Sequence, residues 1–413
     1  MKKRMLLATA LAATMALSAC SSAEPAAAPA TTAASAAATT AVQAEAPDTA
    51  SAEVSPYDQA DTIKLGVVCA RTGSKTLQGD FTFEASTMAV DEMNANGGLL
   101  GKKVELIVED EIETQQDAIN AVNKLLSRGD ISGFFGCMGS TNCIAVSPMV
   151  LEAKVPFMAG GSSYNIIKEN NPYMWQARLT DDKTGELFAK AATQVLNMKN
   201  PALLYITGSF GQGLADKTLE ALKNDYGIEP GLVISFNENE KQFAPFITQV
   251  ANSDCDGMIC ISSTVEAAMI MKQVQSIGLD LPCLGSNAFV GAIGLETAGD
   301  AANGWFGFAD WCDSVQSEKG KKFISDFYER WGTGTEMAAA VSYDSLMLLA
   351  DAIETCGSAD PQKINDTLAT IKDHEGVMGT LSASDSRSFM APYLLVRIED
   401  GQPVIQEVIE YGK

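Results

Sequence analysis

The stretch IKLGVVCARTGSKTLQGDFTFEASTMAVDEMNANGGLLG, residues 63–101, carries the pattern that decides the fold class. It begins with an apolar run of strand length, passes through a short Thr-Gly loop, and continues as a helix-length segment that ends at two adjacent glycines. Continuous rather than alternating apolar residues in the strand indicate burial on both of its faces. A buried strand followed at once by a helix predicts a βαβ unit in a parallel sheet.

The same alternation continues along the chain. Strand-length apolar runs lie at residues 63–70, 104–109, 133–136, 156–159, 202–207, 232–236, 257–261 and 281–285. Segments with apolar residues at helical spacing lie at residues 115–128, 184–198, 214–226, 264–277, 321–331 and 337–355. The series breaks near residues 176–182, and a second series starts at Pro201. The sequence therefore predicts an α/β protein of two doubly wound parallel-sheet lobes, with its site beyond the carboxyl ends of the strands.

The N-terminus has the parts of an export signal. Three basic residues at positions 2–4 precede an apolar run, which ends at Leu17-Ser18-Ala19-Cys20. This ending resembles the lipobox of bacterial lipoproteins, so we expect residues 1–20 to be a lipoprotein signal peptide and Cys20 to be lipidated. A plain secretory cleavage site is the alternative. Residues 21–57, which are mostly Ala, Thr, Ser, Pro and Glu, are predicted to be a disordered tether.

The composition argues against several kinds of partner and chemistry. A formal net charge of −23 disfavours nucleic acid and anionic lipid as partners. The single histidine, His374, cannot complete a zinc site, so no metal is expected. Residues 96–102 (NGGLLGK) and 208–213 (GSFGQG) are rich in glycine but depart from the phosphate-loop and dinucleotide-binding patterns. With no G-x-S-x-G nucleophile elbow either, we expect neither enzymatic activity nor a cofactor.

The order of the segments resembles that of the leucine/isoleucine/valine-binding protein family. Residues 63–101 are similar to the family's opening strand, loop and helix, and residues 104–110 to its second strand with an acidic end. The likeness continues through residues 136–147, 155–164, 210–213, 279–287 and 341–349, and it covers nearly all of residues 62–413.

The resemblance implies a type I periplasmic-binding fold whose two lobes are joined by three crossover segments. It implies an N-terminal lobe of residues 58–179 with 311–390, and a C-terminal lobe of residues 180–310 with 391–413. Family members trap a ligand when the lobes close. Carried over to this chain, the hydroxyl that holds an amino acid's carboxylate corresponds to Thr141, and the next loop contributes the Gly161 carbonyl and the Ser163 hydroxyl. Small residues between a parallel strand and a helix also expose backbone amides that suit an anion.

Other positions depart from the family's amino-acid binders. Gln78 stands where a tyrosine often covers the ligand, Phe210 replaces a tyrosine after the fifth strand, and Ser263 stands at the position of a tyrosine of the second lobe. The family's disulfide is expected to be lost, because Ile112 and Gly139 occupy its cysteine positions.

The glutamate that pairs with the ligand's ammonium in the family corresponds to Asn287. A neutral amide cannot make that charge-assisted contact, so Asp344 or Glu266 is a candidate for the missing carboxylate. The ligand is therefore left open between an amino acid, an amide and a short organic acid.

Together these features predict an extracytoplasmic solute-binding lipoprotein of an ABC importer, anchored to the cell membrane or located in the periplasm. Its expected partners are a small-molecule ligand and the permease and ATPase subunits, and it is expected to be a monomer. The alternative is a protein that presents its ligand to a membrane signalling receptor.

Overall fold

The computed structural model describes residues 54–112, 114–168, 170–315 and 317–409. The predicted signal peptide, Cys20 and most of the predicted tether lie outside these ranges. The last residues of the predicted tether are folded: Pro56–Gln59 form helix α1, and the ring of Tyr57 packs against the core. The Ser55 hydroxyl donates a hydrogen bond of 2.7 Å to Asp360. The folded region therefore begins before residue 58, because these contacts tie the segment to the body.

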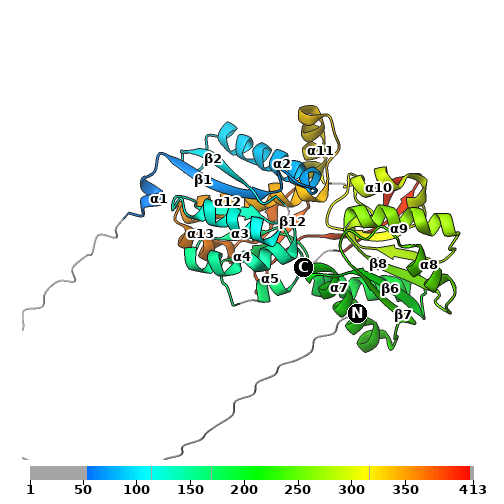
Figure 1. Cartoon of the computed structure of the whole chain (residues 1–413). Coiled ribbons are helices and arrows are strands. Elements are labelled where there is room, and N and C mark those ends of the chain that lie inside the picture. The colour runs from blue at the N-terminus through cyan, green and yellow to red at the C-terminus, as the bar shows by residue number, and fades with distance from the viewer. Residues whose placement is uncertain (1–53, 113, 169, 316, 410–413) are drawn as a thin grey trace, which may run out of the picture. The chain divides into compact units, whose positions relative to one another are not determined.

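The N-terminal lobe contains a five-stranded sheet in the order β2-β1-β3-β4-β5, and all its neighbours are parallel (Figure 1). Its strands are β1 (Thr62–Cys69), β2 (Lys103–Asp110), β3 (Gly133–Gly136), β4 (Phe157–Ala159) and β5 (Met174–Gln176). The helices of this lobe are α2 (Thr76–Ala95), α3 (Gln115–Leu126), α4 (Ser140–Ala153), α5 (Asn165–Lys168), α11 (Glu318–Trp331), α12 (Met337–Cys356) and α13 (Pro361–Leu368).

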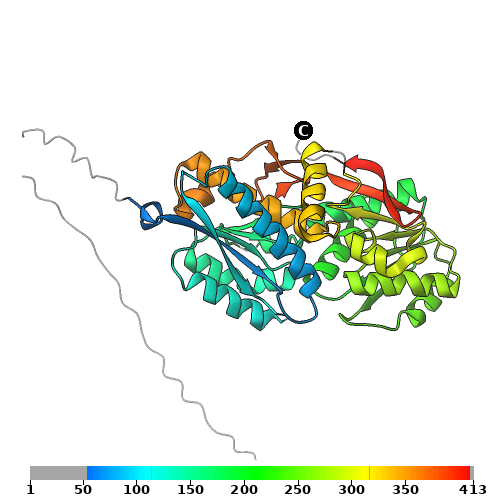
Figure 2. The same cartoon turned by 90° about the horizontal axis from the view of Figure 1, so that it is seen from above.

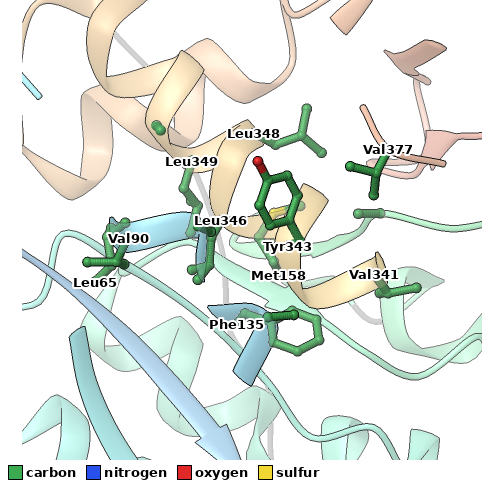
Figure 3. Packing of buried hydrophobic residues seen from close by; sticks show 14 of the residues in the cluster. Leu65, Val90, Phe135, Met158, Val341, Tyr343, Leu346, Leu348, Leu349 and Val377 are labelled. Carbon is green, nitrogen blue, oxygen red and sulfur yellow. The ribbon is translucent and has the colours of Figure 1, made fainter. Parts of the chain in front are cut away.

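Two separate apolar layers cover the faces of this sheet. On one face, Leu65, Val67 and Phe135 pack with residues of α2 and α12. On the other face, Val68 and Phe134 pack with residues of α3 and α4. Figure 3 shows the first layer, in which labelled side chains of α12 gather with those of β1 and β3. Burial on both faces is why these strands read as continuous apolar runs.

The C-terminal lobe contains a seven-stranded sheet in the order β15-β14-β10-β9-β8-β6-β7. Its strands are β6 (Pro201–Ile206), β7 (Leu232–Phe236), β8 (Gly257–Ile261), β9 (Cys283–Gly285), β10 (Phe306–Ala309), β14 (Tyr393–Glu399) and β15 (Gln402–Ile409). The five strands β6–β10 are parallel, whereas β14 is antiparallel to β10 and β15 is antiparallel to β14. The sheet is thus mixed at one edge, where the sequence predicted parallel strands throughout.

Helices again cover both faces of the second sheet. One layer holds α6 (Asp181–Lys190), its π-helical continuation (Ala191–Val195) and α7 (Ser209–Tyr226), packed on Leu203 and Ile259. The opposite layer holds α8 (Ala244–Ala251), α9 (Thr264–Ile277) and α10 (Ala292–Ala298), packed on Leu204 and Met258. Short 3-10 turns at Asn287–Phe289 and Gly299–Ala302 complete it.

The chain passes between the two sheets three times. It leaves the first sheet between β5 and α6, returns between β10 and α11, and leaves again between β13 and β14. Before the last passage it forms a small antiparallel sheet of β11 (His374–Glu375), β12 (Thr380–Ala383) and β13 (Phe389–Met390). The view in Figure 2 shows the late orange and red segments beside both lobes. The predicted class, two α/β lobes with three crossovers, is confirmed.

No helix in the described ranges has the length and apolarity that crossing a membrane would require.

Candidate ligand-binding site

The loops after β3 and β4 meet at the carboxyl edge of the N-terminal sheet. Helix α4 starts directly after β3, and its first residue, Ser140, is buried. The Ser140 hydroxyl accepts a hydrogen bond of 3.2 Å from the backbone amide of Ser163, in the loop after β4. A side chain at Gly161 would lie 2.7 Å from the Cα atom of Ser140, so only glycine allows this approach. The first turn of α4, which includes Thr141, is thus held against the Gly161–Ser163 loop.

Internal contacts fix this loop in place. The Gly161 carbonyl accepts a hydrogen bond of 2.6 Å from the side-chain amide of Gln176. Ser163 is fully buried, and its hydroxyl accepts a hydrogen bond of 3.4 Å from the backbone amide of Asn165. Both predicted contact groups of this loop therefore already have one protein partner each. A carbonyl oxygen has a second lone pair and a hydroxyl has its own hydrogen, so each can still bind a ligand.

Helix α7 brings the C-terminal lobe to the same residues. The backbone amide of Ser209 donates to the Thr141 hydroxyl with a nitrogen–oxygen distance of 3.4 Å. A side chain placed on Gly213, one turn further along, would lie 3.5 Å from the Ser163 hydroxyl oxygen. Phe210, between them, is half-buried and packs against apolar residues of the C-terminal lobe. Thr141, Ser163 and the start of α7 therefore lie together where the two lobes meet.

A second group lies at the ends of β8 and β9. Ser263 is the N-terminal cap residue of α9 and is exposed. Asn287 begins the 3-10 turn after β9, and its side-chain nitrogen is buried without a hydrogen-bond partner among the described residues. A buried amide nitrogen without a partner is costly, and such groups in native proteins call for an explanation. Binding a ligand is one such explanation.

Three further side chains named from the sequence, one carboxamide and two carboxyl groups, make no hydrogen bond with either of these two groups among the described residues. Gln78 lies in the first turn of α2 and is half-buried. Asp344 is completely buried in the N-terminal lobe, where its two oxygens accept hydrogen bonds of 2.8 and 3.0 Å from the amides of Val377 and Met378. Glu266 accepts a hydrogen bond of 2.9 Å from the amide of Asn239. The structure thus does not bring Asp344 to the two groups above, because the returning segment before β12 occupies its carboxylate.

Sequence reasoning missed a buried charged cluster at the crossovers, which we define as Arg178, Asp181, Asp310 and Glu336. Arg178 forms a buried ion pair with Asp310 and donates a hydrogen bond of 3.1 Å to the carbonyl of Gly160. Burial raises the pKa of Asp181 to about 7, and Arg178 acts in the opposite direction. Burial also raises the pKa of Glu336, whose other charged neighbours include Arg178 and Asp310.

The cluster adjoins both groups of site residues. A side chain on Gly213 would lie 3.8 Å from a carboxylate oxygen of Asp181, and one on Gly291 would lie 3.4 Å from a carboxylate oxygen of Glu336. Gly291 follows the turn that Asn287 begins. The sequence break near residues 176–182 marks the first crossover, but it gives no sign that Asp310 and Glu336 meet there.

The described residues offer few groups that could carry covalent or metal chemistry. The eight described cysteines, from Cys69 to Cys356, are free thiols. Burial raises the pKa of the Cys143 thiol, which lies near Thr141 in sequence, to about 12, so the reactive thiolate is disfavoured. Within the described ranges, no three or more His, Cys, Asp or Glu side chains are grouped so that they could hold a metal ion.

The chain is similar to known proteins over most of its length. The family model described as periplasmic binding protein matches residues 62–403. The Leu/Ile/Val-binding protein BraC3 of Rhizobium johnstonii is 25% identical over 365 residues, which cover 87% of this chain and 97% of that protein. An amino acid binding protein of Pseudomonas aeruginosa is 26% identical over 334 residues, which cover 79% of this chain and 87% of that protein.

Solved structures share the fold. The branched-chain amino acid transporter substrate-binding protein of Streptococcus pneumoniae, in complex with isoleucine, matches with a TM-score of 0.76 at 24% identity over 84% of this chain and 99% of that one. A solute-binding protein of an ABC transporter from R. palustris, in complex with benzoate, also matches with a TM-score of 0.76, at 15% identity over 84% and 96% of the two chains. With a family model matched along both lobes, this chain belongs to the periplasmic binding protein family.

Proposed function

We propose that this chain is the extracytoplasmic solute-binding component of an ABC importer and that it encloses one small polar ligand between its two lobes. Binding and delivery, rather than catalysis, are its proposed task. Membership of the periplasmic binding protein family supports this function at the level of class.

The observation that carries the proposal is the meeting of the two lobes at Thr141 and Ser163. Both side chains lie at the carboxyl edge of the N-terminal sheet, and the first turns of α7 from the C-terminal lobe contact or face them. Ligands of open α/β sheets bind at this edge. Here the edge is built from hydroxyls, backbone amides and glycines, which suit a ligand with a carboxylate or carbonyl oxygen.

The ligand is proposed to be an amino acid or a similar small molecule. Relatives named as binders of leucine, isoleucine and valine support an amino acid, whereas the similar fold bound to benzoate shows that this architecture also holds an aromatic acid. Asn287, in place of the family's glutamate, keeps amides and short organic acids within the proposed range.

Membrane attachment and partners complete the proposal. The sequence Leu17-Ser18-Ala19-Cys20 supports a lipid anchor at Cys20, and the tether after it would let the two lobes reach membrane-embedded permease subunits. The permease and its ATPase subunits are the proposed partners.

A thermal-shift screen followed by calorimetric titration tests the function. The purified chain is mixed with the twenty common L-amino acids, their amides, short organic acids and benzoate. A ligand that binds only the native protein stabilises it by mass action and so raises its melting temperature. The free energy of unfolding rises by about 2.7 kcal/mol when the ligand concentration is one hundred times Kd. We expect at least one of these compounds to bind with one-to-one stoichiometry. If none of them binds, the proposed ligand range is wrong.

A further inference from the structure

Glu336 is a buried carboxylate with only one of its oxygens engaged. It is the N-terminal cap of α12, and its Oε2 atom accepts a hydrogen bond of 2.8 Å from the amide of Ala338. Its Oε1 atom has no hydrogen-bond partner in the part of the chain that the structure describes, although the residue is only 5% exposed. Capping the helix therefore explains the position of Oε2, but it gives no role to Oε1.

The free oxygen of Glu336 faces Gly291 in the C-terminal lobe. A side-chain carbon at Gly291 would lie 3.4 Å from Glu336 Oε1 and 3.8 Å from the side-chain oxygen of Asn287. The Asn287 side chain also has no hydrogen-bond partner among the described residues, and its nitrogen is buried. Two unused acceptor oxygens, one from each lobe, thus converge on a position where the chain has no side chain. Such a position suits a group that donates several hydrogen bonds.

The surrounding charge favours a cation at this position. The buried charged cluster contains three acidic side chains, of Asp181, Asp310 and Glu336, and the one cation of Arg178. That cation is already paired with Asp310 and hydrogen-bonded to the Gly160 carbonyl. Burial raises the pKa of both Asp181 and Glu336, which means that ionising them costs free energy without a further positive partner. A ligand ammonium would supply that partner.

The other candidate carboxylates do not compete for this role. Asp344 uses both of its oxygens on backbone amides in its own lobe, and Glu266 uses one oxygen on the Asn239 amide. The atoms nearest to a side chain on Gly291 belong to Glu336 and Asn287, not to these two residues. On the basis of the function proposed above, we propose that the Glu336 carboxylate and the side-chain oxygen of Asn287 together bind the ammonium group of the ligand. The substrate class is then a small molecule with an ammonium at one end and a carboxylate at the other, the latter held by Thr141 and the Gly161–Ser163 loop.

The test uses matched probes that differ only in the amine. Calorimetric titration of the wild-type chain is carried out with each of the twenty common L-amino acids and with the corresponding 2-hydroxy acids. We expect an amino acid to bind and its 2-hydroxy acid to bind at least about 30-fold more weakly, the effect of removing one partner of a buried charge pair. Equal binding of the two, or binding of the hydroxy acid alone, would overturn the role of Glu336 and leave the solute-binding function intact.

Two variants then test whether the ligand's ammonium binds beside Glu336 and Gly291. Glu336→Gln keeps an oxygen for the Ala338 amide, so a purely capping role predicts unchanged binding, whereas we expect at least about 30-fold weaker binding of the amino acid. Gly291→Ala adds a methyl group at ordinary contact distance from Glu336 Oε1, in a backbone conformation (φ −76°) that alanine tolerates. It should fold with a similar melting temperature and still lose affinity, because the methyl fills the ammonium position.

Glu354→Gln is the control, since it changes a carboxylate near the other end of α12 whose Oε1 accepts a hydrogen bond from the Leu100 amide. Its affinity should equal that of wild type. Unchanged affinity in both Glu336→Gln and Gly291→Ala would show that the ammonium binds elsewhere. Failure of every amino acid and hydroxy acid to bind would instead reject both this substrate class and the amino-acid range of the proposed function.

Discussion

The hydroxyl of Thr141 accepts a hydrogen bond from the backbone amide of Ser209, with the oxygen and nitrogen 3.4 Å apart. The two residues belong to different lobes, Thr141 to the first turn of α4 and Ser209 to the first turn of α7. Because the hydroxyl is the acceptor in this contact, its own hydrogen remains available to donate to a ligand oxygen. One side chain can thus join the ligand to both lobes.

Removing this hydroxyl should weaken ligand binding. We expect Thr141→Val, which keeps the shape of the side chain, and Ser163→Ala each to weaken binding by about 1–3 kcal/mol, or roughly 5- to 150-fold, since a ligand oxygen loses a partner. Calorimetric titration with the ligand found in the screen measures the effect. Thr248→Val, at an exposed position on α8, is the matched control and should bind like wild type. Full affinity in both site variants would mean that these hydroxyls are not ligand contacts.

Asn287 provides an independent check on the C-terminal lobe. Its side-chain amide has no partner among the described residues, so Asn287→Ala removes no protein hydrogen bond and should leave the melting temperature of the free protein nearly unchanged. Ligand affinity, in contrast, should fall about 5- to 150-fold because the amide's contact with the ligand is lost. Asn120→Ala, on the exposed surface of α3, is the control for truncating an asparagine. A variant that loses stability but keeps its affinity would indicate a structural role instead.

The buried carboxyl of Asp181 should make stability depend on pH. Burial raises its pKa from the ordinary value of 3.8 to about 7, despite the opposing effect of Arg178 and with Asp310 and Asp182 as acidic neighbours. The folded state therefore holds a proton that the unfolded state releases above about pH 4, so this contribution to stability is lost as pH rises towards and through 7. We expect Asp181→Asn to flatten the fall in melting temperature between pH 5 and 8. An equally steep fall in the variant would show that other groups cause it.

Eight strands of the two large sheets were predictable from apolar runs, whereas β5, β10, β14 and β15 were not, although β10 and β14 are mostly buried. The predicted runs at residues 133–136, 232–236 and 257–261 coincide with β3, β7 and β8. Strand β5 has only three residues, too few to show a period, and most residues of β15 are partly or fully exposed. Helix α7 begins at Ser209 and not at residue 214. Its glycine-rich start includes Gly211, where a side chain would lie 1.9 Å from the Ile206 carbonyl of the preceding strand.

The site was predictable only where its residues lie directly after a strand. Thr141, Ser163 and Asn287 follow β3, β4 and β9, so their position at the sheet edge could be inferred from the strand pattern. Glu336 lies in the segment before α12, and its proximity to Gly291 depends on how two distant crossovers pack. Asp344 looked like a free carboxylate in the sequence because its partners, the amides of Val377 and Met378, lie on a segment that returns from far along the chain.

The membrane anchor is testable without knowing the ligand. Cys20→Ala should release the chain from membranes or leave it with an uncleaved signal peptide, because the expected diacylglyceryl group is attached through the cysteine sulfur. Fractionation of cells, with Ser22→Ala as the control, measures the first effect, and mass spectrometry of the mature N-terminus measures the second. An unacylated mature terminus in the wild-type protein would rule out the anchor.

In the proposed complex, one small ligand lies between the lobes, with its carboxylate at Thr141 and Ser163 and its opposite end at Asn287 and Glu336. A crystal structure of the protein with the ligand from the screen tests this arrangement most directly. We expect electron density for the ligand within hydrogen-bond distance of Thr141 or Ser163 in the N-terminal lobe and of Asn287 in the C-terminal lobe. Density for the ligand at another place on the surface, or in contact with one lobe alone, would contradict it.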